Sequence, residues 1–248
     1  MKVLITGTSR GIGRACALLY LSKGHTVIGI DRNESSITDQ ERYTHIQADI
    51  TGDLPVIDGV EILVNNAGIQ GEQAGRAGSK GSADFNGCDD INSRDGCDDI
   101  NGSDMIDVID VNLKGTIAVT EKYAFTPAIS SVVFMASSSA SNGAEFPLYA
   151  ASKGGVVAYM KNTALRLASY GATCNSISAG GVLTELNAHI IQNPDLMEQC
   201  LNETLLHKWA EAEEIAQLCY YLTNVNKSMT GQDLLIDNGE QLRSNFIW

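Results

Sequence analysis

Short runs of aliphatic and β-branched residues alternate along the chain with longer stretches in which apolar residues recur every three or four positions. The short runs predict strands at residues 3–5, 26–30, 45–48, 62–64, 132–135, 174–177 and 234–236. The periodic stretches predict helices near residues 12–23, 104–125, 150–170, 195–206 and 211–224. Strands that are apolar throughout and flanked by helices are buried on both faces. The pattern therefore predicts an α/β fold, a doubly wound parallel sheet with helices on both faces.

Two segments depart from this alternation. Residues 51–60, which include Pro55 and Gly59, are too few for an ordinary covering helix, so that side of the sheet should be thinly covered. Residues 71–103 have almost no apolar periodicity and contain a tandem repeat, GCDDIN, at 87–92 and 96–101. They predict a long, partly disordered acidic surface loop of low complexity within a single domain that spans residues 1–248.

The same loop raises the question of an ion site, because nine aspartates stand between residues 84 and 110. Residues 90–96 resemble the start of a calcium loop, but the third oxygen ligand and the glycine each come one place late and no glutamate closes the loop. Cys88 and Cys97 could pair or bind a metal, but two thiols alone make a weak site. We therefore expect a solvated loop and no metal.

Composition narrows the classes of partner. With 248 residues, 44% of them hydrophobic, the chain can close one sizeable core. Seventeen basic against 30 acidic residues give a net charge of −13, which would repel a nucleic-acid backbone and an anionic membrane surface. No apolar run at the start suits a signal peptide or a span, so a cytoplasmic protein is expected. Cys16, Cys174, Cys200 and Cys219 lie in apolar patterns and should be buried free thiols.

A glycine-rich turn, TGTSRGIG at residues 6–13, follows the first strand and opens directly into the first helix. Glycines let the backbone approach a pyrophosphate, and the helix N-terminus offers N–H groups to it, as in a Rossmann-type dinucleotide site. Asp31 ends the second strand, where a carboxylate can accept ribose hydroxyls and repel a 2′-phosphate. NAD is therefore favoured over NADP, although Arg32 could pair with that phosphate.

Tyr149 and Lys153 are four residues apart in a helical pattern, so they share one helix face. A cation within about 4–6 Å can lower the pKa of a phenol by roughly 1–3 units, which makes the pair a usable proton shuttle. Ser137, twelve residues earlier at the end of a strand, is placed to hydrogen-bond a substrate carbonyl. A Tyr and Lys at this spacing are usually a surface pair when they occur alone; their combination with Ser137 and the glycine loop indicates catalysis.

With these motifs in place, the chain resembles the classical short-chain dehydrogenase/reductase family over nearly its whole length. Residues 6–13 match the family's TGxxxGxG loop, residues 65–68 match its NNAG segment, and Asn112 matches its catalytic asparagine. The resemblance implies that Asn112, Ser137, Tyr149 and Lys153 are catalytic. It implies a cofactor site made of Gly7, Ser9, Arg10, Gly11, Ile12, Gly13, Asp31, Arg32, Asp49, Ile50, Asn66, Ala67, Gly68, Tyr149, Lys153, Gly180, Val182 and Thr184.

The resemblance also implies individual roles. Asp49 would contact adenine, Asn112 would hold a water near the lysine, and Lys153 would bind the nicotinamide ribose. The supporting residues have simpler explanations as well: Asn112 as a cap, and Asn65 and Asn66 as turn formers.

Three departures from the family pattern stand out. Ala179-Gly180-Gly181 replaces the family's Pro-Gly, and the acidic loop is about twenty residues longer than usual. The interval from Ser137 to Tyr149 is one residue shorter than usual, which leaves Ser138 as a second candidate for the oxygen-binding serine.

Together these features predict an NAD(P)(H)-dependent oxidoreductase that interconverts a secondary alcohol and a ketone by hydride transfer. The alternatives are a dinucleotide-binding regulator without turnover and an epimerase or dehydratase of the extended family. Leu186, Ile190, Ile191, Met197 and Leu205 would give the substrate pocket an apolar lining, which suits a hydrophobic substrate, although ordinary helix packing explains them equally well. By resemblance, the chain should form a homotetramer or homodimer through the helices at 104–125 and 150–170.

Overall fold

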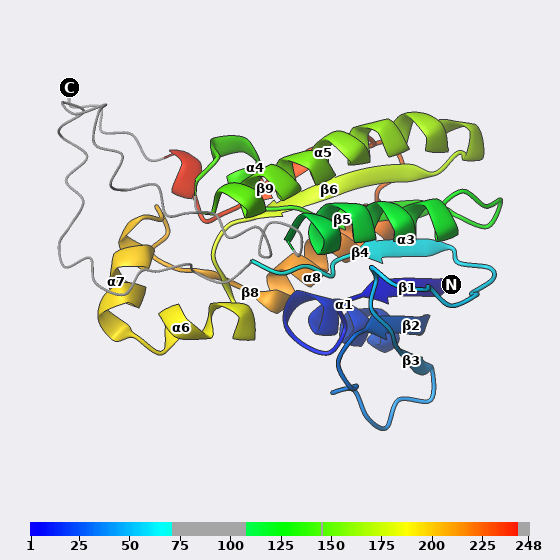
Figure 1. Cartoon of the computed structure of the whole chain (residues 1–248), viewed down its shortest axis with the longest axis horizontal. Helices are drawn as coiled ribbons and strands as arrows, with labels where there is room; N and C mark the ends of the chain where they lie inside the picture. Colours follow the sequence, from blue (N-terminus) through cyan, green and yellow to red (C-terminus); the bar gives the residue numbers. More distant parts are fainter. Residues whose placement is uncertain (71–107, 145, 243–248) are drawn as a thin grey trace.

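The structure, a computed structural model, describes residues 1–70, 108–144 and 146–242 (Figure 1). One sheet of seven strands has the order β3-β2-β1-β4-β5-β6-β9, and every pairing in it is parallel. Its strands are β1 (Lys2–Thr6), β2 (Thr26–Asp31), β3 (Tyr43–Gln47), β4 (Ile62–Asn65), β5 (Ser131–Met135), β6 (Thr173–Ala179) and β9 (Asp233–Ile236). This confirms the predicted doubly wound parallel sheet.

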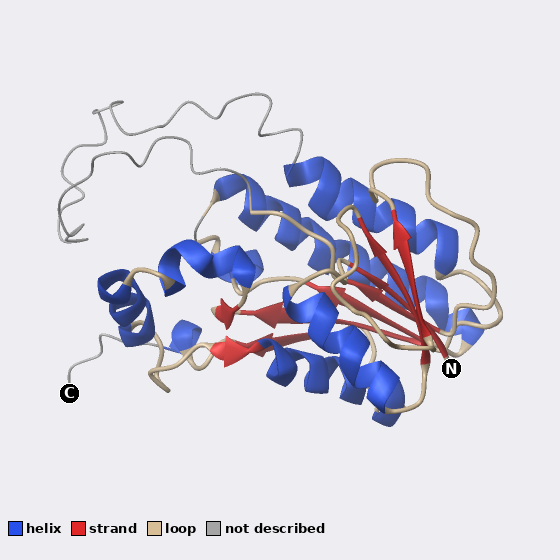
Figure 2. Cartoon of the chain, turned by 90° about the horizontal axis from the view of Figure 1, so that it is seen from below, coloured by secondary structure: helices blue, strands red, loops and turns tan. Residues whose placement is uncertain are grey.

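Helices cover both faces of the sheet, so the strands lie between two helical layers (Figure 2). On one face α1 (Gly11–Ser22) and α8 (Ala212–Tyr220) pack on the strands, and on the other α3 (Thr116–Tyr123) and α5 (Pro147–Leu167) do. Two separate hydrophobic clusters result, one on each face. The remaining α-helices of the described residues are α4 (Ser139–Asn142), α6 (Ala188–Ile191) and α7 (Pro194–Asn202).

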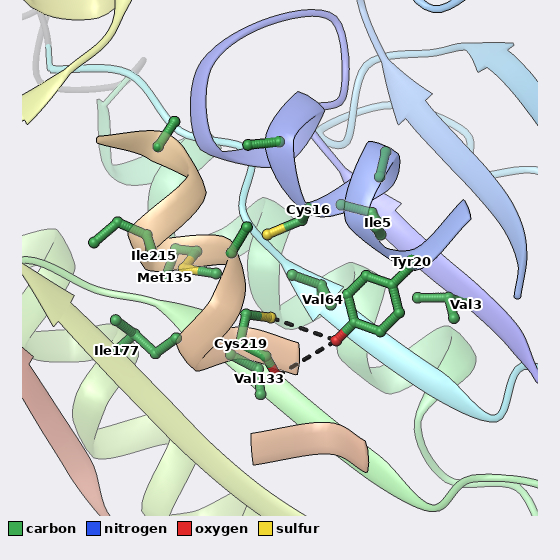
Figure 3. Close-up of a cluster of buried hydrophobic side chains, with 14 of the residues drawn as sticks. Val3, Ile5, Cys16, Tyr20, Val64, Val133, Met135, Ile177, Ile215 and Cys219 are labelled. Carbon is green, nitrogen blue, oxygen red and sulfur yellow. Dashed lines mark hydrogen bonds between the residues drawn. The ribbon is translucent and has the colours of Figure 1, made fainter. Parts of the chain in front are cut away.

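Figure 3 shows how the first cluster joins α1 to α8. The buried hydroxyl of Tyr20 donates to the carbonyl oxygen of Cys219 over 3.4 Å, and it also contacts the hydroxyl of Thr223. Cys16 and Cys219 lie in this cluster, and Cys174 lies in the other. All three are buried free thiols as predicted, whereas Cys200 is only half-buried, since it lies on the amphipathic helix α7 near the surface.

The crossover between β3 and β4 contains no helix, as its length predicted. It lies instead against α3, where the hydroxyl of Tyr123 donates to the carbonyl of Pro55 over 2.5 Å. Val56 beside it is 84% exposed. The predicted absence of a covering helix is confirmed, and no residue of β3 at this edge is fully buried.

Some element boundaries were wrong or missed. The helix expected at 195–206 ends at Asn202, because the hydroxyl of Thr204 bonds the carbonyl of Leu201 and the chain turns there. A wide π turn, Asp110–Gly115, precedes α3, and another, Tyr221–Val225, follows α8. The two-stranded sheet of β7 (Val182–Leu183) and β8 (Ala210–Glu211) was not predicted, since two residues carry no periodicity.

The acidic repeat at 71–103, with Cys88 and Cys97, lies outside the described residues. Within the described ranges, no helix has the length and apolar character needed to cross a membrane. The same ranges hold no cluster of three or more His, Cys, Asp or Glu side chains that could bind a metal ion.

Candidate active site

A cleft opens at the carboxyl ends of the strands, where the strand order reverses between β1 and β4. It encloses about 1070 Å³ of unfilled space, and this volume includes open solvent at its mouth. The predicted residues that line it are Gly7, Arg10, Gly11, Ile12, Asp31, Arg32, Asp49, Ile50, Asn66, Ala67, Gly68, Tyr149, Lys153 and Thr184.

The remaining predicted residues lie behind this lining or beside it. Ser9 and Gly13 belong to the glycine loop, and Asn112 and Ser137 are almost fully buried next to the cleft. Val182 is buried in β7, and the N–H of Gly180 donates to the carbonyl of Ile236.

The glycine loop has a conformation that side chains would prevent. Gly7 has φ +76°, a backbone region that favours glycine, and a Cβ on Gly13 would lie 2.0 Å from the carbonyl oxygen of Gly7. The amide of Asn66 donates to the carbonyls of Thr6 and Gly7 over 2.9 and 3.1 Å. The loop is therefore held close to the first turn of α1, which leaves the cradle that a pyrophosphate needs.

Asp31 is buried at the end of β2, and both of its carboxylate oxygens accept hydrogen bonds. The N–H of Ser9 donates to Oδ2 over 2.9 Å, and the N–H and side-chain amide of Asn33 donate to Oδ1 over 2.9 and 3.1 Å. The carboxylate thus ties the glycine loop to the turn after β2. Oδ2 keeps a lone pair for a further donor.

Asp49 follows β3 and lies at the same edge of the cleft. Its Oδ1 accepts from the N–H and the hydroxyl of Thr51, both at 2.8 Å. These hydrogen bonds, with a smaller contribution from the Arg32 cation, lower the pKa of Asp49. Its side chain is therefore a fixed carboxylate that can accept from an amino group in the cleft.

Tyr149 and Lys153 lie together on the first turns of α5. The Lys153 ammonium lies 5.6 Å from the centre of the Tyr149 ring, and it donates to the carbonyl oxygen of Met135 over 2.8 Å. Lys153 is only 6% exposed, and this burial lowers its pKa to about 8. A buried cation beside a phenol favours the phenolate, so the pair can exchange a proton with a bound oxygen.

Asn112 holds the chain that leaves β4. Its side chain exchanges two hydrogen bonds with the backbone of Ile69, both at 2.8 Å, and its amide also donates to the hydroxyl of Ser152 over 3.1 Å. A Cβ on Gly68 would lie 3.1 Å from Oδ1 of Asn112 and 3.4 Å from Nζ of Lys153. Asn112 therefore lies near Lys153, at the π turn that was not predicted.

Three serines follow β5, and their hydrogen bonds differ. Oγ of Ser137 accepts from the hydroxyl of Ser139 over 2.9 Å, which leaves the Ser137 proton for another acceptor. The carbonyl of Ser138 accepts from the side chain of Gln241 over 2.7 Å. The Ser137 hydroxyl can therefore donate to a substrate oxygen, and the choice between Ser137 and Ser138 stays a prediction.

The structure also explains one departure from the family pattern. A Cβ on Gly181 would lie 2.3 Å from the indole of Trp209, and one on Gly180 would lie 2.8 Å from the side chain of Asp237. The loop after β6 is thus packed on both sides. Among the apolar residues expected around the substrate, Leu186 lines the cleft and Ile191 lines a neighbouring hollow, while Leu205 is 54% exposed.

Sequence reasoning missed several residues that line the cleft. Strand-end residues such as Met135 and Ala136 could have been found from the rule that ligands bind at the carboxyl ends of parallel strands. Glu185 carries no motif, because its place depends on how the segment after β7 folds back to the glycine loop. The lining residues that were missed are Ile30, Asn33, Ala48, Ile69, Val111, Met135, Ala136 and Glu185.

Known proteins are similar to this chain in sequence over almost its whole length. The family described as enoyl-(acyl carrier protein) reductase matches residues 7–241. Dehydrogenase/reductase SDR family member 6 of Xenopus laevis is 29% identical over 255 residues, which cover 97% of this chain and 97% of that protein.

Solved structures of other proteins have the same fold as this chain. A short chain dehydrogenase family protein from Francisella tularensis subsp. tularensis aligns with a TM-score of 0.78 at 26% identity, covering 98% of this chain and 99% of that one. A 4-hydroxyisoleucine dehydrogenase mutant, complexed with NADH and succinate, has the same fold with a TM-score of 0.80 at 23% identity, covering 99% and 100%. The matched family covers most of the glycine loop and all of the Tyr149–Lys153 pair, and the chain belongs to the classical short-chain dehydrogenase/reductase family.

Proposed function

We propose that this protein is a nicotinamide-dependent oxidoreductase that interconverts a secondary alcohol and a ketone. The observation that carries the proposal is the position of Tyr149 and the buried Lys153 ammonium in the same cleft as the glycine loop. A dinucleotide-binding regulator would need the cradle but not a phenol and a buried cation beside it. The 4-hydroxyisoleucine dehydrogenase of the same fold was solved with NADH.

The residues that line the cleft fit such a cofactor. Gly7 and the first turn of α1 form a cradle for a pyrophosphate, and the close approach of Gly13 to the Gly7 carbonyl, which a Cβ would prevent, holds its shape. Asp31 would hold the adenine ribose, Asp49 the adenine, and Lys153 the nicotinamide ribose. The bound nicotinamide supplies the hydride that is exchanged with the substrate carbon.

The chain's own groups move the proton and orient the substrate. In reduction, Tyr149 donates its phenolic proton to the carbonyl oxygen, and in oxidation the phenolate removes the hydroxyl proton. The Lys153 ammonium stabilises that phenolate, and the Ser137 hydroxyl donates a hydrogen bond to the substrate oxygen. Leu186 and Val111 give the cleft apolar walls, so a hydrophobic alcohol or ketone is the proposed substrate class.

The proposal is tested by a substrate screen that follows the absorbance of reduced nicotinamide with both cofactors. Turnover of at least one secondary alcohol or ketone supports it. Cofactor binding by the wild type without turnover of any member of a broad panel would favour the regulator instead.

NAD should be preferred over NADP, because the Asp31 carboxylate faces the position of the adenine ribose and would repel a 2′-phosphate. We expect kcat/KM with NADH to exceed that with NADPH by about ten-fold or more. Asp31→Asn should reduce this ratio. Both oxygens of Asp31 also accept from backbone N–H groups, so Asp31→Asn can disturb the loop and lower the rate with either cofactor. The readout is therefore the ratio of kcat/KM with NADH to kcat/KM with NADPH.

Arg32→Ala provides the matched comparison for Asp31→Asn. It should leave the preference for NADH in place. A wild-type enzyme that prefers NADPH, with the preference lost in Arg32→Ala, would show that Arg32 governs the adenosine end of the cleft.

A homodimer or homotetramer formed through α3 and α5 is the expected assembly. Leu165 on α5 is 78% exposed and Tyr170 just after α5 is 41% exposed, an apolar surface that a partner copy would cover. Light scattering at micromolar concentration should give at least twice the chain mass. Leu165→Glu should shift the protein toward the monomer, and a monomeric wild type would contradict the prediction.

A further inference from the structure

The carboxylate of Glu185 lies at the N-terminus of α1 and accepts a hydrogen bond from its first residue, Gly11. Glu185 begins the short turn Glu185–Asn187, 174 residues beyond Gly11 in the sequence, and its Oε2 accepts from the N–H of Gly11 over 3.1 Å. Both residues line the cleft. An anionic oxygen from the chain itself therefore bonds an N–H group of the glycine loop.

No side chain at the start of α1 caps this end of the helix. Arg10, the residue before α1, makes no side-chain capping bond, and the first turn of α1 has no acidic residue. A helix N-terminus carries a partial positive charge and favours an anion. Glu185 thus places a negative charge at the N-terminus of α1, where the pyrophosphate of a dinucleotide lies in a Rossmann-type site.

We propose that Glu185 competes with the cofactor's diphosphate for the glycine loop, so that the carboxylate must leave before the dinucleotide is fully seated. This inference rests on the proposed function, since it concerns the cofactor of that site. The competition has two causes. The carboxylate and the diphosphate would both accept from the N–H of Gly11, and the two negative charges would repel each other at the N-terminus of α1. Glu185 therefore weakens cofactor binding and speeds cofactor release.

The side chain can leave without unfolding the segment that carries it. The turn is held by the N–H of Asn187, which donates to the carbonyl of Thr184 over 3.0 Å, and by the Asn187 side chain, which donates to Val182 over 2.8 Å. Neither bond involves the carboxylate of Glu185, which is exposed to solvent. Rotation of one side chain is enough to clear the loop, so the exchange carries little structural cost.

Glu185→Gln tests the proposal because it removes the charge and keeps the shape. From the size of charge effects at helix N-termini, we expect the Kd for NADH to fall by about 3- to 30-fold. Isothermal titration at low and high salt measures it, and the difference from wild type should shrink at high salt because the effect is electrostatic. Inorganic pyrophosphate, free of divalent cations, is the second probe and should also bind Glu185→Gln more tightly.

Glu213→Gln is the matched control. Glu213 is an exposed glutamate on the neighbouring hollow that Gly11 and Glu185 also line, and its replacement removes the same charge from the same region. The Kd values of this variant for NADH and pyrophosphate should stay within about two-fold of wild type, because no bond from the glycine loop to its carboxylate is lost.

The outcomes separate this inference from the proposed function. An unchanged or weaker pyrophosphate affinity in Glu185→Gln overturns the competition, and weaker binding would show that Glu185 supports the loop instead. An equal gain in both glutamine variants also overturns it, since general charge would then be the cause. A wild type that binds neither NADH nor NADPH refutes the proposed function, while the pyrophosphate titration still decides the role of Glu185.

Discussion

Tyr149→Phe is expected to reduce turnover by about 10²- to 10⁴-fold, the range for loss of a general acid or base, while changing the Kd for NADH by no more than a few-fold. The substitution removes one oxygen and keeps the ring, so the packing at the start of α5 is preserved. The cofactor would be held mainly by the glycine loop, Asp31 and Lys153. Stopped-flow single turnovers and NADH titration measure the two quantities separately.

Tyr159→Phe on the same helix is the control for this experiment. Tyr159 lies further along α5, and its hydroxyl donates to the carboxylate of Glu121 over a distance of 2.7 Å. Neither residue lines the cleft. Loss of the hydroxyl should leave turnover within about two-fold of wild type, as for most exposed hydrogen bonds. If Tyr149→Phe retained most of its turnover on a good substrate, the central assignment of the active site would be lost.

Most of the fold was predictable because its signals are local. The strands of the main sheet are mostly short apolar runs, such as those in Ile62–Asn65 and Ser131–Met135, and their parallel order follows from the helices between them. The β7 and β8 pair was missed because it depends on a contact between Val182 and Ala210 that leaves no periodic signal.

The candidate site was predictable for a different reason. The glycine loop, Tyr149 and Lys153 each stand beside the end of a strand or at the start of a helix, and the carboxyl ends of parallel strands meet at one edge. The structure brings these residues into one cleft. Their chemical roles stay predictions, which Tyr149→Phe and Lys153→Met test.

Glu185 shows what the sequence could not supply. Its carboxylate reaches Gly11 only because the chain returns from β6 toward the glycine loop through β7. Asp31 is a related case, since its motif indicates a ribose contact and the structure adds its bonds to Ser9 and Asn33. Such bonds depend on where two distant segments meet, and neither segment alone carries a signal for them.

Lys153 should be a source of instability as well as of activity. It is almost fully buried, and burial lowers its pKa from 10.5 to about 8, which means that the folded state disfavours its charge. Below pH 8 the ammonium is charged in both states, so the penalty is present in full at pH 7. Between about pH 8 and 10.5 the folded state loses its proton first, the unfolded state binds more protons, and the penalty fades as pH rises.

Lys153→Met is therefore expected to lose activity and gain stability. After allowing for the donor that the Met135 carbonyl loses, the net gain at pH 7 is about 1–2 kcal/mol, or a rise in Tm of about 2–6 °C. Turnover should fall by at least about 10²-fold, because the phenolate of Tyr149 loses its cation. NADH affinity should also weaken, in contrast to Tyr149→Phe, since Lys153 is proposed to hold the ribose.

Thermal unfolding of the cofactor-free protein between pH 6.5 and 10 measures this effect, with Lys161→Met as the control. Lys161 is an exposed lysine further along the same helix, so its replacement should change Tm little at any pH. The gain in Lys153→Met should be largest below pH 8 and shrink toward pH 10. A variant less stable than wild type at pH 7 would show that the bond to Met135 and the contact with Tyr149 outweigh the burial of the charge, and the Lys153 ammonium would then be a stabilising part of the fold.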